Sequence, residues 1–365
     1  MSLRILHLLN HTNRLNGHVH AAIDLAAAQR DLGHVTMIAS GGGDFDALMA
    51  RAGIETARID HARRTRVLAG SALALRRLVR DWRPDLVHAH MMTSAVLAWP
   101  VCRLAGLPLV TTVHNSFERS AILMGLGTRA IGVSAAVTAA MVGRGIPRGR
   151  IETVLNGTIG SVRFRGRDRD VAALPWPTIL SVAGLHPRKG LPYLLDAFAI
   201  AHARFPEARL CLVGEGPYEA AYRAQAAALP CAGAITFAGG QDDPSPWMRG
   251  AAIFVLPSLD EPAGLVLSEA REAGCAVIAS RVGGIPEMLE GGRAGRLVPP
   301  GDAAALAAAL CGLLGDPARL AQARADSQIG IERMRLERVA RETLAVYGRA
   351  LRRKIPVPKI AEQDP

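Results

Sequence analysis

Two glutamates, Glu261 and Glu269, are separated by seven residues in a stretch where apolar and polar segments alternate. A carboxylate in front of a helix can orient sugar hydroxyls, and a carboxylate on the helix can hold a ribose diol. Between them, Gly264 and Leu265 would offer backbone N–H groups at a helix N-terminus, where phosphate binds readily. The same spacing also fits a solvated helix with two incidental glutamates, so the pair alone leaves both interpretations open.

The segment around the glutamates has the pattern of a βαβ unit. Residues 253–256 form a short apolar run typical of a buried parallel strand, followed by a loop rich in proline and glycine. Helix-forming residues occupy 265–273, and Gly274 stands where a helix would end. A second buried strand is expected at 275–279, before the Gly283-Gly284 turn. The glutamates are thus placed on the loop and the helix that join two strands of one sheet.

This stretch resembles the signature of glycosyltransferase family 4. The resemblance is carried by VLPSLDEPAGLVLSEAREAGCAVIASRVGGIPE, in which strand, loop, helix, strand and double-glycine turn come in order. It implies an α/β protein of the GT-B fold, with two Rossmann-like doubly wound domains facing across a cleft. It also implies a retaining hexosyltransferase that moves sugar from a UDP- or GDP-linked donor to an acceptor hydroxyl, without a metal or another cofactor.

The resemblance gives roles to particular residues. His114, in the sequence TVHN, matches the family's active-site histidine beside the donor sugar, and Lys189 matches its diphosphate-binding lysine. Glu261 would orient the hydroxyls of the donor sugar and completes the expected catalytic set. Glu269 would hold the ribose, and no side chain is assigned as a covalent nucleophile. The residues expected to bind the donor are Asn16, Gly17, Arg188, Gly264, Leu265, Val266 and Glu269.

Two departures from the family pattern bear on activity. Members often carry an arginine five residues before the diphosphate lysine, where this chain has Gly184. The diphosphate would lose one charge-assisted contact, which Arg188 or Arg281 could replace. Many members also have two glycines in the first loop, where this chain has Asn16 and Gly17. Gly184 motivates a second hypothesis, a catalytically silent GT-B scaffold protein. A nucleotide-sugar epimerase or a phosphorylase on the same fold is a third.

The length of 365 residues suits two domains of ordinary size. We expect an N-terminal, acceptor-side Rossmann-like domain over residues 1–165 and a C-terminal, nucleotide-sugar-binding one over residues 166–345. The boundary lies in a charged stretch at 160–177 that contains glycine and proline. A terminal helix is expected at 331–352, and the family resemblance implies that it crosses back to the first domain. Residues 354–365 are expected to form a tail.

Several expected strands of the N-terminal half end in polar residues. These strands are expected at 4–9, 35–39, 85–90, 109–113, 131–133 and 151–155. Asn10, His90 and His114 are three of the polar residues at their ends. Because ligands of an open parallel sheet bind at the carboxyl ends of its strands, such residues mark a binding edge. No GxGxxG motif follows the first strand, so a dinucleotide site is not supported.

Metal binding is considered at three places and set aside. His88 and His90 share one face of a strand, but no carboxylate or third ligand lies nearby in the sequence. Residues 168–170 and 44–46 have the Asp-x-Asp pattern of metal-dependent sugar transferases. The first lies in a polar linker without a preceding buried strand, and three glycines separate the second from its strand. No metal site is therefore predicted.

The net charge of +11 is concentrated in the first half of the chain. Residues 1–165 contain 20 arginines, no lysine and 10 acidic residues, and arginines cluster at 63–66 and 76–83. A basic surface attracts nucleic acid, an anionic membrane or an acidic substrate, or it simply solvates the fold with arginine. Aromatic residues form 4% of the chain and do not interleave with basic ones, which argues against nucleic acid. An acceptor on a lipid carrier or a lipid A-like anchor is therefore a hypothesis.

A basic amphipathic helix is expected at about 69–82, either lying on a membrane or, as we favour, packing its Leu73/Leu78 side on the protein. The five cysteines are scattered without a CxxC motif and suit reduced, buried thiols. No signal peptide or membrane span is expected. These features favour a cytoplasmic protein, and the basic first half would place it peripherally at the inner face of the cell membrane. The family resemblance implies an enzyme of cell-surface polysaccharide or lipopolysaccharide synthesis.

Overall fold

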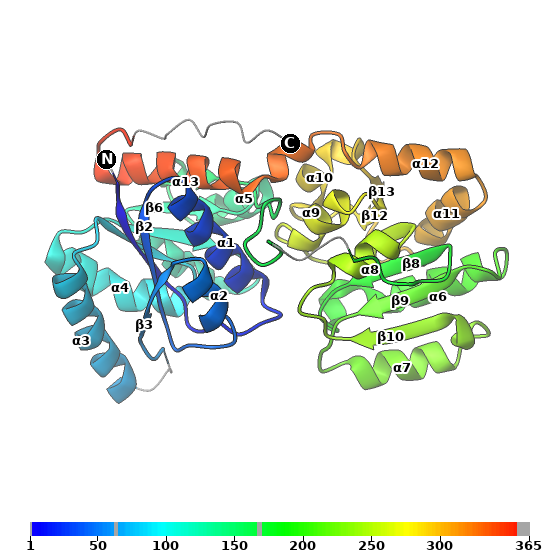
Figure 1. Ribbon diagram of the computed structural model, residues 1–365, viewed down its shortest axis with the longest axis horizontal. Helices are drawn as coiled ribbons and strands as arrows, with labels where there is room; N and C mark the ends of the chain where they lie inside the picture. Colours follow the sequence, from blue (N-terminus) through cyan, green and yellow to red (C-terminus); the bar gives the residue numbers. More distant parts are fainter. Residues whose placement is uncertain (1, 62–64, 166–169, 356–365) are drawn as a thin grey trace. The chain divides into compact units, whose positions relative to one another are not determined.

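The computed structural model describes residues 2–61, 65–165 and 170–355, which form two compact α/β units (Figure 1). The first unit comprises the described residues up to Arg165 and those from Arg335 onward, and the second comprises the described residues between them. The second unit ends at Met334 rather than at residue 345, because the last helix packs in the first unit. Three of the sequence predictions concern residues outside the described ones. These residues are Arg63 and Arg64 of the arginine cluster, residues 166–169 with most of the Asp168–Asp170 motif, and tail residues 356–365.

The first unit contains a parallel sheet of seven strands in the order β3-β2-β1-β4-β5-β6-β7. The strands are β1 Arg4–Leu8, β2 Val35–Ser40, β3 Glu55–Arg58, β4 Leu86–Ala89, β5 Leu109–Val113, β6 Arg129–Gly132 and β7 Ile151–Thr153. Strand β3 was not expected from the sequence, because it is a short edge strand with mostly exposed residues. The strand order reverses between β1 and β4, which is the switch point where ligands bind in open α/β sheets.

Helices cover both faces of this sheet. They are α1 Gly17–Asp31, α2 Asp46–Arg51, α3 Thr65–Trp82, α4 Met92–Ala105, α5 Ala135–Gly143 and α13 Leu336–Leu351, with short 3-10 turns η1 Arg119–Leu126 and η2 Arg148–Arg150. Helix α13 packs beside α1 on one face, where Leu25, Val110 and Leu344 belong to one buried cluster. Helix α13 thus covers only the later part of the helix expected at 331–352, because residues 331–334 form a 3-10 turn in the second unit.

The buried side of α3 differs from the expected one. Leu75, Val79 and Trp82 are buried, whereas Leu73 is 48% exposed. The expected Leu73/Leu78 side was wrong because residues 75, 79 and 82 follow the i, i+4, i+7 spacing of one helical face, and Leu73 lies off that face. The helix nevertheless packs on the protein through an apolar stripe, as the sequence favoured.

The second unit repeats the doubly wound topology with six parallel strands in the order β10-β9-β8-β11-β12-β13. The strands are β8 Thr178–Val182, β9 Arg209–Val213, β10 Ile235–Gly239, β11 Ile253–Leu256, β12 Ala276–Ser280 and β13 Arg296–Val298. The helices are α6 Leu191–His202, α7 Glu219–Ala227, α8 Ser245–Gly250, α9 Leu265–Glu272, α10 Ile285–Met288, α11 Ala303–Leu314 and α12 Pro317–Asp326, with 3-10 turns η3 Pro187–Lys189, η4 Ala232–Ala234, η5 Glu290–Gly292 and η6 Ile331–Met334. Its switch point lies between β8 and β11.

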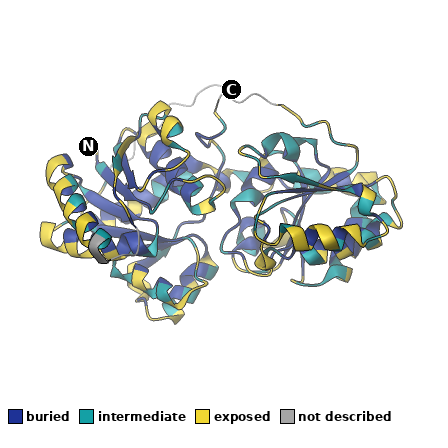
Figure 2. Ribbon diagram, turned by 90° about the horizontal axis from the view of Figure 1, so that it is seen from below, coloured by how far each residue is buried: buried dark blue, intermediate teal, exposed yellow. Residues whose placement is uncertain are grey.

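The central strands of both units are buried, and the outer sides of the helices are exposed (Figure 2). Every residue of β11 and β12 is buried, which fits continuous apolar strands covered on both faces. Within the described part of the chain, no single helix is long and apolar enough to cross a membrane, and α11 with α12 reaches that composition only as a pair bent by 107°.

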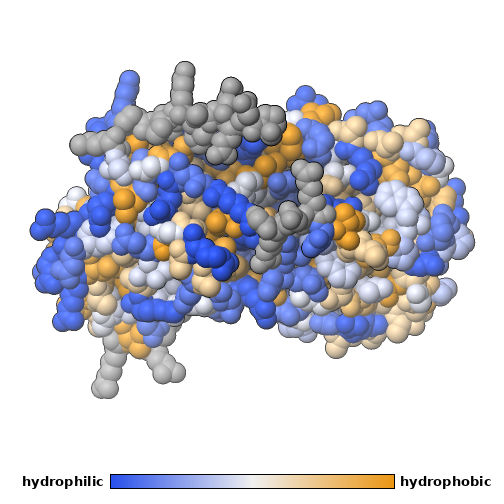
Figure 3. Space-filling model, in the orientation of Figure 1, coloured by the Kyte–Doolittle hydropathy of each residue, from blue (hydrophilic) through white to orange (hydrophobic). Residues whose placement is uncertain are grey.

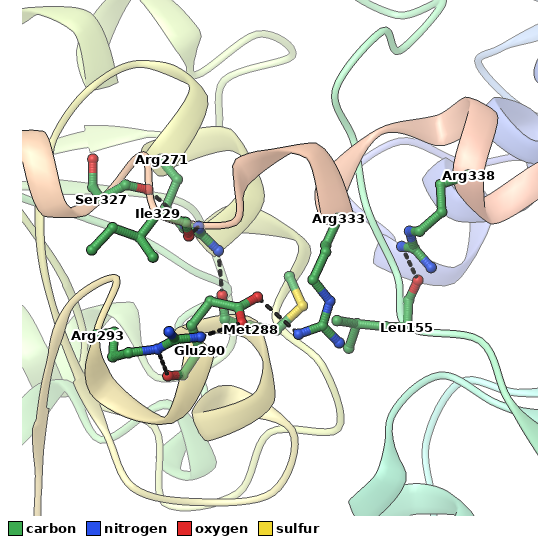
Figure 4. Close-up of polar contacts among 9 residues, drawn as sticks. All are labelled: Leu155, Arg271, Met288, Glu290, Arg293, Ser327, Ile329, Arg333 and Arg338. Carbon is green, nitrogen blue, oxygen red and sulfur yellow. Dashed lines mark hydrogen bonds and ion pairs between the residues drawn. The ribbon is translucent and has the colours of Figure 1, made fainter.

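A buried arginine fixes helix α9 in the second unit (Figure 4). Arg271 is fully buried and donates to the backbone carbonyls of Met288, Ser327 and Ile329 at 2.5–2.8 Å. These bonds hold the chain after α12 against α9, two residues from Glu269. In the first unit, the side chain of Arg338 on α13 donates to the carbonyl of Leu155 at 2.6 Å (Figure 4).

Candidate functional site

Lys189 and Glu261 form a buried ion pair at the switch point of the second unit. Lys189 ends the turn after β8, and Glu261 lies in the loop after the neighbouring strand β11. Nζ of Lys189 lies 2.5 Å from Oε2 of Glu261, and Oγ of Ser258 donates to the same oxygen at 3.2 Å. Their side chains are only 12% and 8% exposed. The fold therefore brings together two of the three residues expected to be catalytic.

Two glycine turns clamp the loop that carries Glu261. Gly190 has φ +67°, and a Cβ on it would lie 2.0 Å from the carbonyl oxygen of Pro257. Gly283 has φ +51°, and a Cβ there would lie 1.9 Å from the carbonyl oxygen of Glu261. The N–H of Gly284 donates to that same oxygen at 3.0 Å. The double-glycine turn of the motif thus exists because the backbone of Glu261 passes within contact distance of it.

Helix α9 begins beside this pair. Gly264 is its N-cap residue, with φ +67° and no capping side chain, and Leu265 is the first helical residue. The first N–H groups of a helix have no partner inside the helix, so Leu265 and Val266 can donate to an anion. Glu269 lies one turn further along α9 and is only 6% exposed. The predicted donor-binding residues of this segment are therefore neighbours on one helix.

The turn after β8 also contains Gly184, which stands where the family often has an arginine, and Arg188, which could replace that arginine. The side chain of Arg188 is exposed, and its carbonyl accepts from the N–H of Leu259 at 2.7 Å. Gly184 is exposed too, and a Cβ on it would make only ordinary contacts, 3.6 Å from His186 and 3.8 Å from Glu215. Packing therefore does not require glycine at position 184.

In the first unit, the loop after β1 places Asn16 and Gly17 at the start of α1. The side chain of Asn16 donates to the carbonyl of Arg14 at 2.9 Å, and Gly17 is the exposed first helical residue. His18 follows, and its ring centroid lies 6.2 Å from that of His114. Sequence reasoning did not single out His18. The fold therefore joins the predicted first loop to the predicted active-site histidine.

His114 is the outermost member of a row of imidazoles. Its Nε2 lies 3.1 Å from Nδ1 of His90, whose Nε2 lies 2.9 Å from Nδ1 of His7. Burial lowers the pKa of His114 to about 3 and that of His7 to about 4, so both rings are neutral near pH 7. The charge of His18 lowers the pKa of His114 further. Sequence reasoning missed His7, which belongs to β1, the strand paired with β4.

His7, His88 and His90 are a group whose ring nitrogens lie within 4.8 Å of one another, as a metal site requires. His7 supplies the third histidine that was not apparent in the sequence, because it comes from another strand. The ring nitrogens already have side-chain partners, which for His88 are Tyr347 at 2.6 Å and Thr112 at 2.7 Å. The group is therefore explained as a satisfied hydrogen-bond network.

The comparisons with known proteins agree with this geometry. Residues 15–158 match the model of Glycosyltransferase Family 4, and residues 176–316 match that of Glycosyl transferases group 1. A D-inositol 3-phosphate glycosyltransferase 2 from Catenulispora acidiphila is 31% identical over 304 residues, which cover 73% of this chain and 71% of that protein. A phosphatidyl-myo-inositol mannosyltransferase from Mycolicibacterium smegmatis is 44% identical over 133 residues, 36% of this chain and 34% of that protein.

Solved structures have the same fold. Alr3699/HepE from Anabaena, in complex with UDP-glucose, has a TM-score of 0.80 at 21% identity, over 95% of this chain and 100% of that chain. A glycosyltransferase from Rickettsia africae has a TM-score of 0.79 at 19% identity, over 97% and 100%. The expected GT-B fold, with two Rossmann-like domains, is therefore confirmed.

Proposed function

The chain belongs to glycosyltransferase family 4, and from that premise we propose that it moves a hexosyl group from a nucleoside diphosphate sugar to an acceptor hydroxyl, with retention at the anomeric carbon. The observation that carries the proposal is the buried Lys189–Glu261 pair at the switch point of the second unit, beside the N-terminus of α9. A cation and free backbone N–H groups at that point suit a diphosphate.

The leaving diphosphate is the charge that the reaction must stabilise. Lys189 donates one hydrogen bond to Glu261, and its ammonium group has two further N–H donors for phosphate oxygens. The exposed side chain of Arg188 and the N–H groups of Leu265 and Val266 add to this positive potential. Because these groups belong to the chain itself, we propose that transfer does not require a divalent metal.

The remaining residues are proposed to hold the sugar and the nucleoside. Glu261 is an acceptor-only group with several lone pairs, so beyond Lys189 and Ser258 it can accept from sugar hydroxyls. Glu269 is proposed to bind the ribose diol, supported by the fixed position of α9. His114 is proposed to contact the donor sugar, and Asn16 with Gly17 the donor phosphate or the acceptor.

The acceptor is proposed to be a sugar or polyol hydroxyl, free or on a lipid carrier, in the synthesis of a surface polysaccharide or lipopolysaccharide. The two curated relatives are named for D-inositol 3-phosphate and phosphatidyl-myo-inositol, which adds inositol-type acceptors to the candidates. Helices α3 and α4 expose Arg76, Arg77 and Arg80 together with Leu73 and Trp99, and the surface drawn in Figure 3 is a mixture of hydrophilic and scattered hydrophobic residues. This composition suits weak binding to an anionic membrane from the cytoplasmic side.

Donor turnover tests the proposed reaction. The protein is incubated with UDP-glucose, UDP-galactose, UDP-N-acetylglucosamine or GDP-mannose in the presence of a chelator, and the released UDP or GDP is quantified. We expect release from one donor, lost in Lys189→Ala and Glu261→Ala, and a product whose anomeric configuration by NMR matches the donor. Release that occurs only after divalent metal is added would contradict the metal-independent mechanism.

Two further outcomes have defined meanings. If no donor is turned over, the assay is repeated with myo-inositol, inositol phosphate and membrane extract as acceptors. Donor binding without release from any mixture would favour the silent scaffold protein, which the exposed Gly184 in place of the family arginine motivates. Failure of the protein to sediment with anionic vesicles at low salt would remove the support for membrane association.

A further inference from the structure

The buried histidines of the first unit form a continuous chain of hydrogen bonds that ends at His114. It starts at Gln29 on α1, whose Oε1 lies 2.9 Å from Nε2 of His7 on β1. Nδ1 of His7 then meets Nε2 of His90 at 2.9 Å, and Nδ1 of His90 meets Nε2 of His114 at 3.1 Å. Gln29 and His7 are fully buried, so the inner end of the chain is shielded from bulk water.

The imidazoles of this chain are neutral. Burial lowers the pKa of His7 to about 4 and that of His114 to about 3, and it lowers the pKa of His90 well below its ordinary value. A neutral imidazole has one N–H and one lone pair on its two ring nitrogens. When one nitrogen donates, the other must accept. The direction of one hydrogen bond in the chain therefore determines the direction of the next.

Gln29 sets this direction because its amide has a donor end and an acceptor end. Nε2 of Gln29 donates to the hydroxyl of Tyr347 on α13 at 3.2 Å, which leaves Oε1 as the acceptor for His7. His7 must then carry its proton on Nε2, and His90 and His114 follow with the same tautomer. Nδ1 of His114 is left with a lone pair, to which no residue in the described part of the chain donates.

A second branch from Gln29 has donors and acceptors that agree with the first. The hydroxyl of Tyr347 accepts from Gln29 and donates to Nδ1 of His88 at 2.6 Å. Nε2 of His88 then donates to Oγ1 of Thr112 at 2.7 Å. One orientation of a single amide thus satisfies both branches. Reversing that amide would reverse each proton in both branches and would place the N–H of His114 on Nδ1.

We propose that Gln29 is a positioning residue: through His7 and His90 it fixes the tautomer of His114, so that Nδ1 of His114 accepts a hydrogen bond from a sugar hydroxyl. This inference rests on the proposed function, in which His114 contacts the donor sugar. In the reversed tautomer, Nδ1 of His114 would carry the proton. It could then donate to a sugar oxygen but could not accept from a sugar hydroxyl. Nε2 of the neighbouring His18 is a buried polar atom without a partner among the described residues, which also suits a polar ligand at this place.

The tautomers can be observed directly, without donor or turnover. The full chain is labelled with [15N]histidine, and two-bond 1H–15N correlation spectra distinguish Nδ1–H from Nε2–H rings. A His114→Gln variant assigns the His114 signal by its loss. We expect His7, His88, His90 and His114 all to be Nε2–H at pH 7.5. An Nδ1–H ring at His114 in the unmodified protein would overturn the proposal without any variant of Gln29.

Two substitutions of Gln29 separate positioning from packing. Gln29→Met has a similar length but no polar end, so His114 should become a mixture of both tautomers. We expect kcat to fall on the order of tenfold with KM little changed, as for other groups that orient a functional side chain. In Gln29→Glu the carboxylate accepts from both His7 and Tyr347. His114 should therefore stay Nε2–H, whereas His88, now facing a hydroxyl that donates elsewhere, should become Nδ1–H.

Thr111→Val is the matched control. Thr111 is fully buried on β5, beside Thr112, and donates to the carbonyl of Met124 at 2.6 Å, outside the histidine network. The Thr111→Val variant should be less stable than the unmodified protein, as the Gln29 variants should be. Every histidine in it should nevertheless keep its tautomer. An unchanged His114 tautomer in Gln29→Met would overturn the proposal. If the tautomers are as expected but no donor is turned over, the positioning role of Gln29 stands, and the result counts against the proposed function.

Discussion

The two units share one topology but place different chemistry at the carboxyl ends of their strands. In the first unit, His7, His90 and His114 form a row of neutral imidazoles linked by hydrogen bonds, which starts at Gln29 and ends at His114. In the second, Lys189 and Glu261 form an ion pair in a loop that two glycine turns clamp. The first arrangement offers directional hydrogen bonds without charge, and the second offers charge on a rigid backbone. The first arrangement suits the hydroxyl groups of a sugar, and the second suits the charge of a diphosphate.

Removing the lysine of the buried ion pair in the second unit should cause the largest loss of donor turnover. Lys189→Ala takes away the proposed charge on the diphosphate and leaves Glu261 buried without its partner. We expect donor turnover to fall by about 10²–10³-fold, the range for removing one preorganised stabilising group. Nucleoside diphosphate release is the measurement. Arg223→Ala removes a cation from an exposed pair with Glu219 in the same unit, and it should leave turnover within about twofold.

A substitution at Gly283 should show whether activity depends on the close contact between this glycine and the backbone of Glu261. Gly283→Ala would place a methyl group 1.9 Å from the carbonyl oxygen of Glu261, so the loop must move. Gly274→Ala is the matched control, because Gly274 also has positive φ but no neighbour within 4 Å. The control should lose about 1–2 kcal/mol of stability from strain alone, with turnover kept.

Gly283→Ala should lose more stability than the control and should also lose most of its turnover. Thermal unfolding and donor turnover of the two variants are compared in the same buffer. Equal turnover in both variants would mean that the close contact does not position Glu261.

Low pH should destabilise the first unit before the second, because the first unit contains the buried, neutral histidines. The folded first unit holds His7 with a pKa of about 4 and His114 with a pKa of about 3, whereas an unfolded histidine has a pKa of about 6.5. Between these values the unfolded state binds more protons, so stability falls as pH drops from about 6.5 toward 4. The second unit has only His186 and His202 of the eleven histidines.

Hydrogen exchange, corrected for its intrinsic pH dependence, should therefore show strands β1, β4 and β5 losing protection at pH 5 before β8, β11 and β12. Loss of protection in both sheets at the same pH would show that the imidazole row does not set the acid response.

The smallest effect is expected from restoring the family arginine. Gly184 is exposed, and a Cβ there makes only ordinary contacts, so Gly184→Arg should fold normally. An added charge-assisted hydrogen bond to the diphosphate should tighten donor binding by about three- to tenfold. Gly233→Arg adds the same charge at an exposed site with open space and should leave the donor dissociation constant unchanged. A similar gain in both variants would indicate long-range attraction rather than a contact.

Local patterns in the sequence were sufficient for the segment that carries the glutamates. The expected strand at 253–256 is β11, and the helix expected at 265–273 is α9, which ends one residue earlier. Continuous apolar runs predict buried parallel strands, and a glycine with positive φ marks the end of the helix at Gly274. Such signals depend on neighbouring residues only.

Contacts between distant strands could not be predicted from the same patterns. His7 and His90 are 83 residues apart, and they meet because β1 pairs with β4. Tyr347 joins the network from α13, whose return to the first sheet was predicted only through the family resemblance. One signal was present in the sequence: His88 and His90 share one face of the strand expected at 85–90. Without the strand order, however, it gives no partners.

The proposed role of His114 as a sugar contact is tested most directly by measuring UDP affinity and donor turnover of His114→Ala in one preparation. We expect a UDP dissociation constant within about twofold of that of the unmodified protein, because the groups proposed to bind the diphosphate belong to the second unit. We expect kcat to fall by about 10²-fold, because the proposed imidazole contact with the sugar is lost. A parallel loss of UDP affinity, or an unchanged kcat, would contradict the proposal that His114 contacts the sugar rather than the nucleotide.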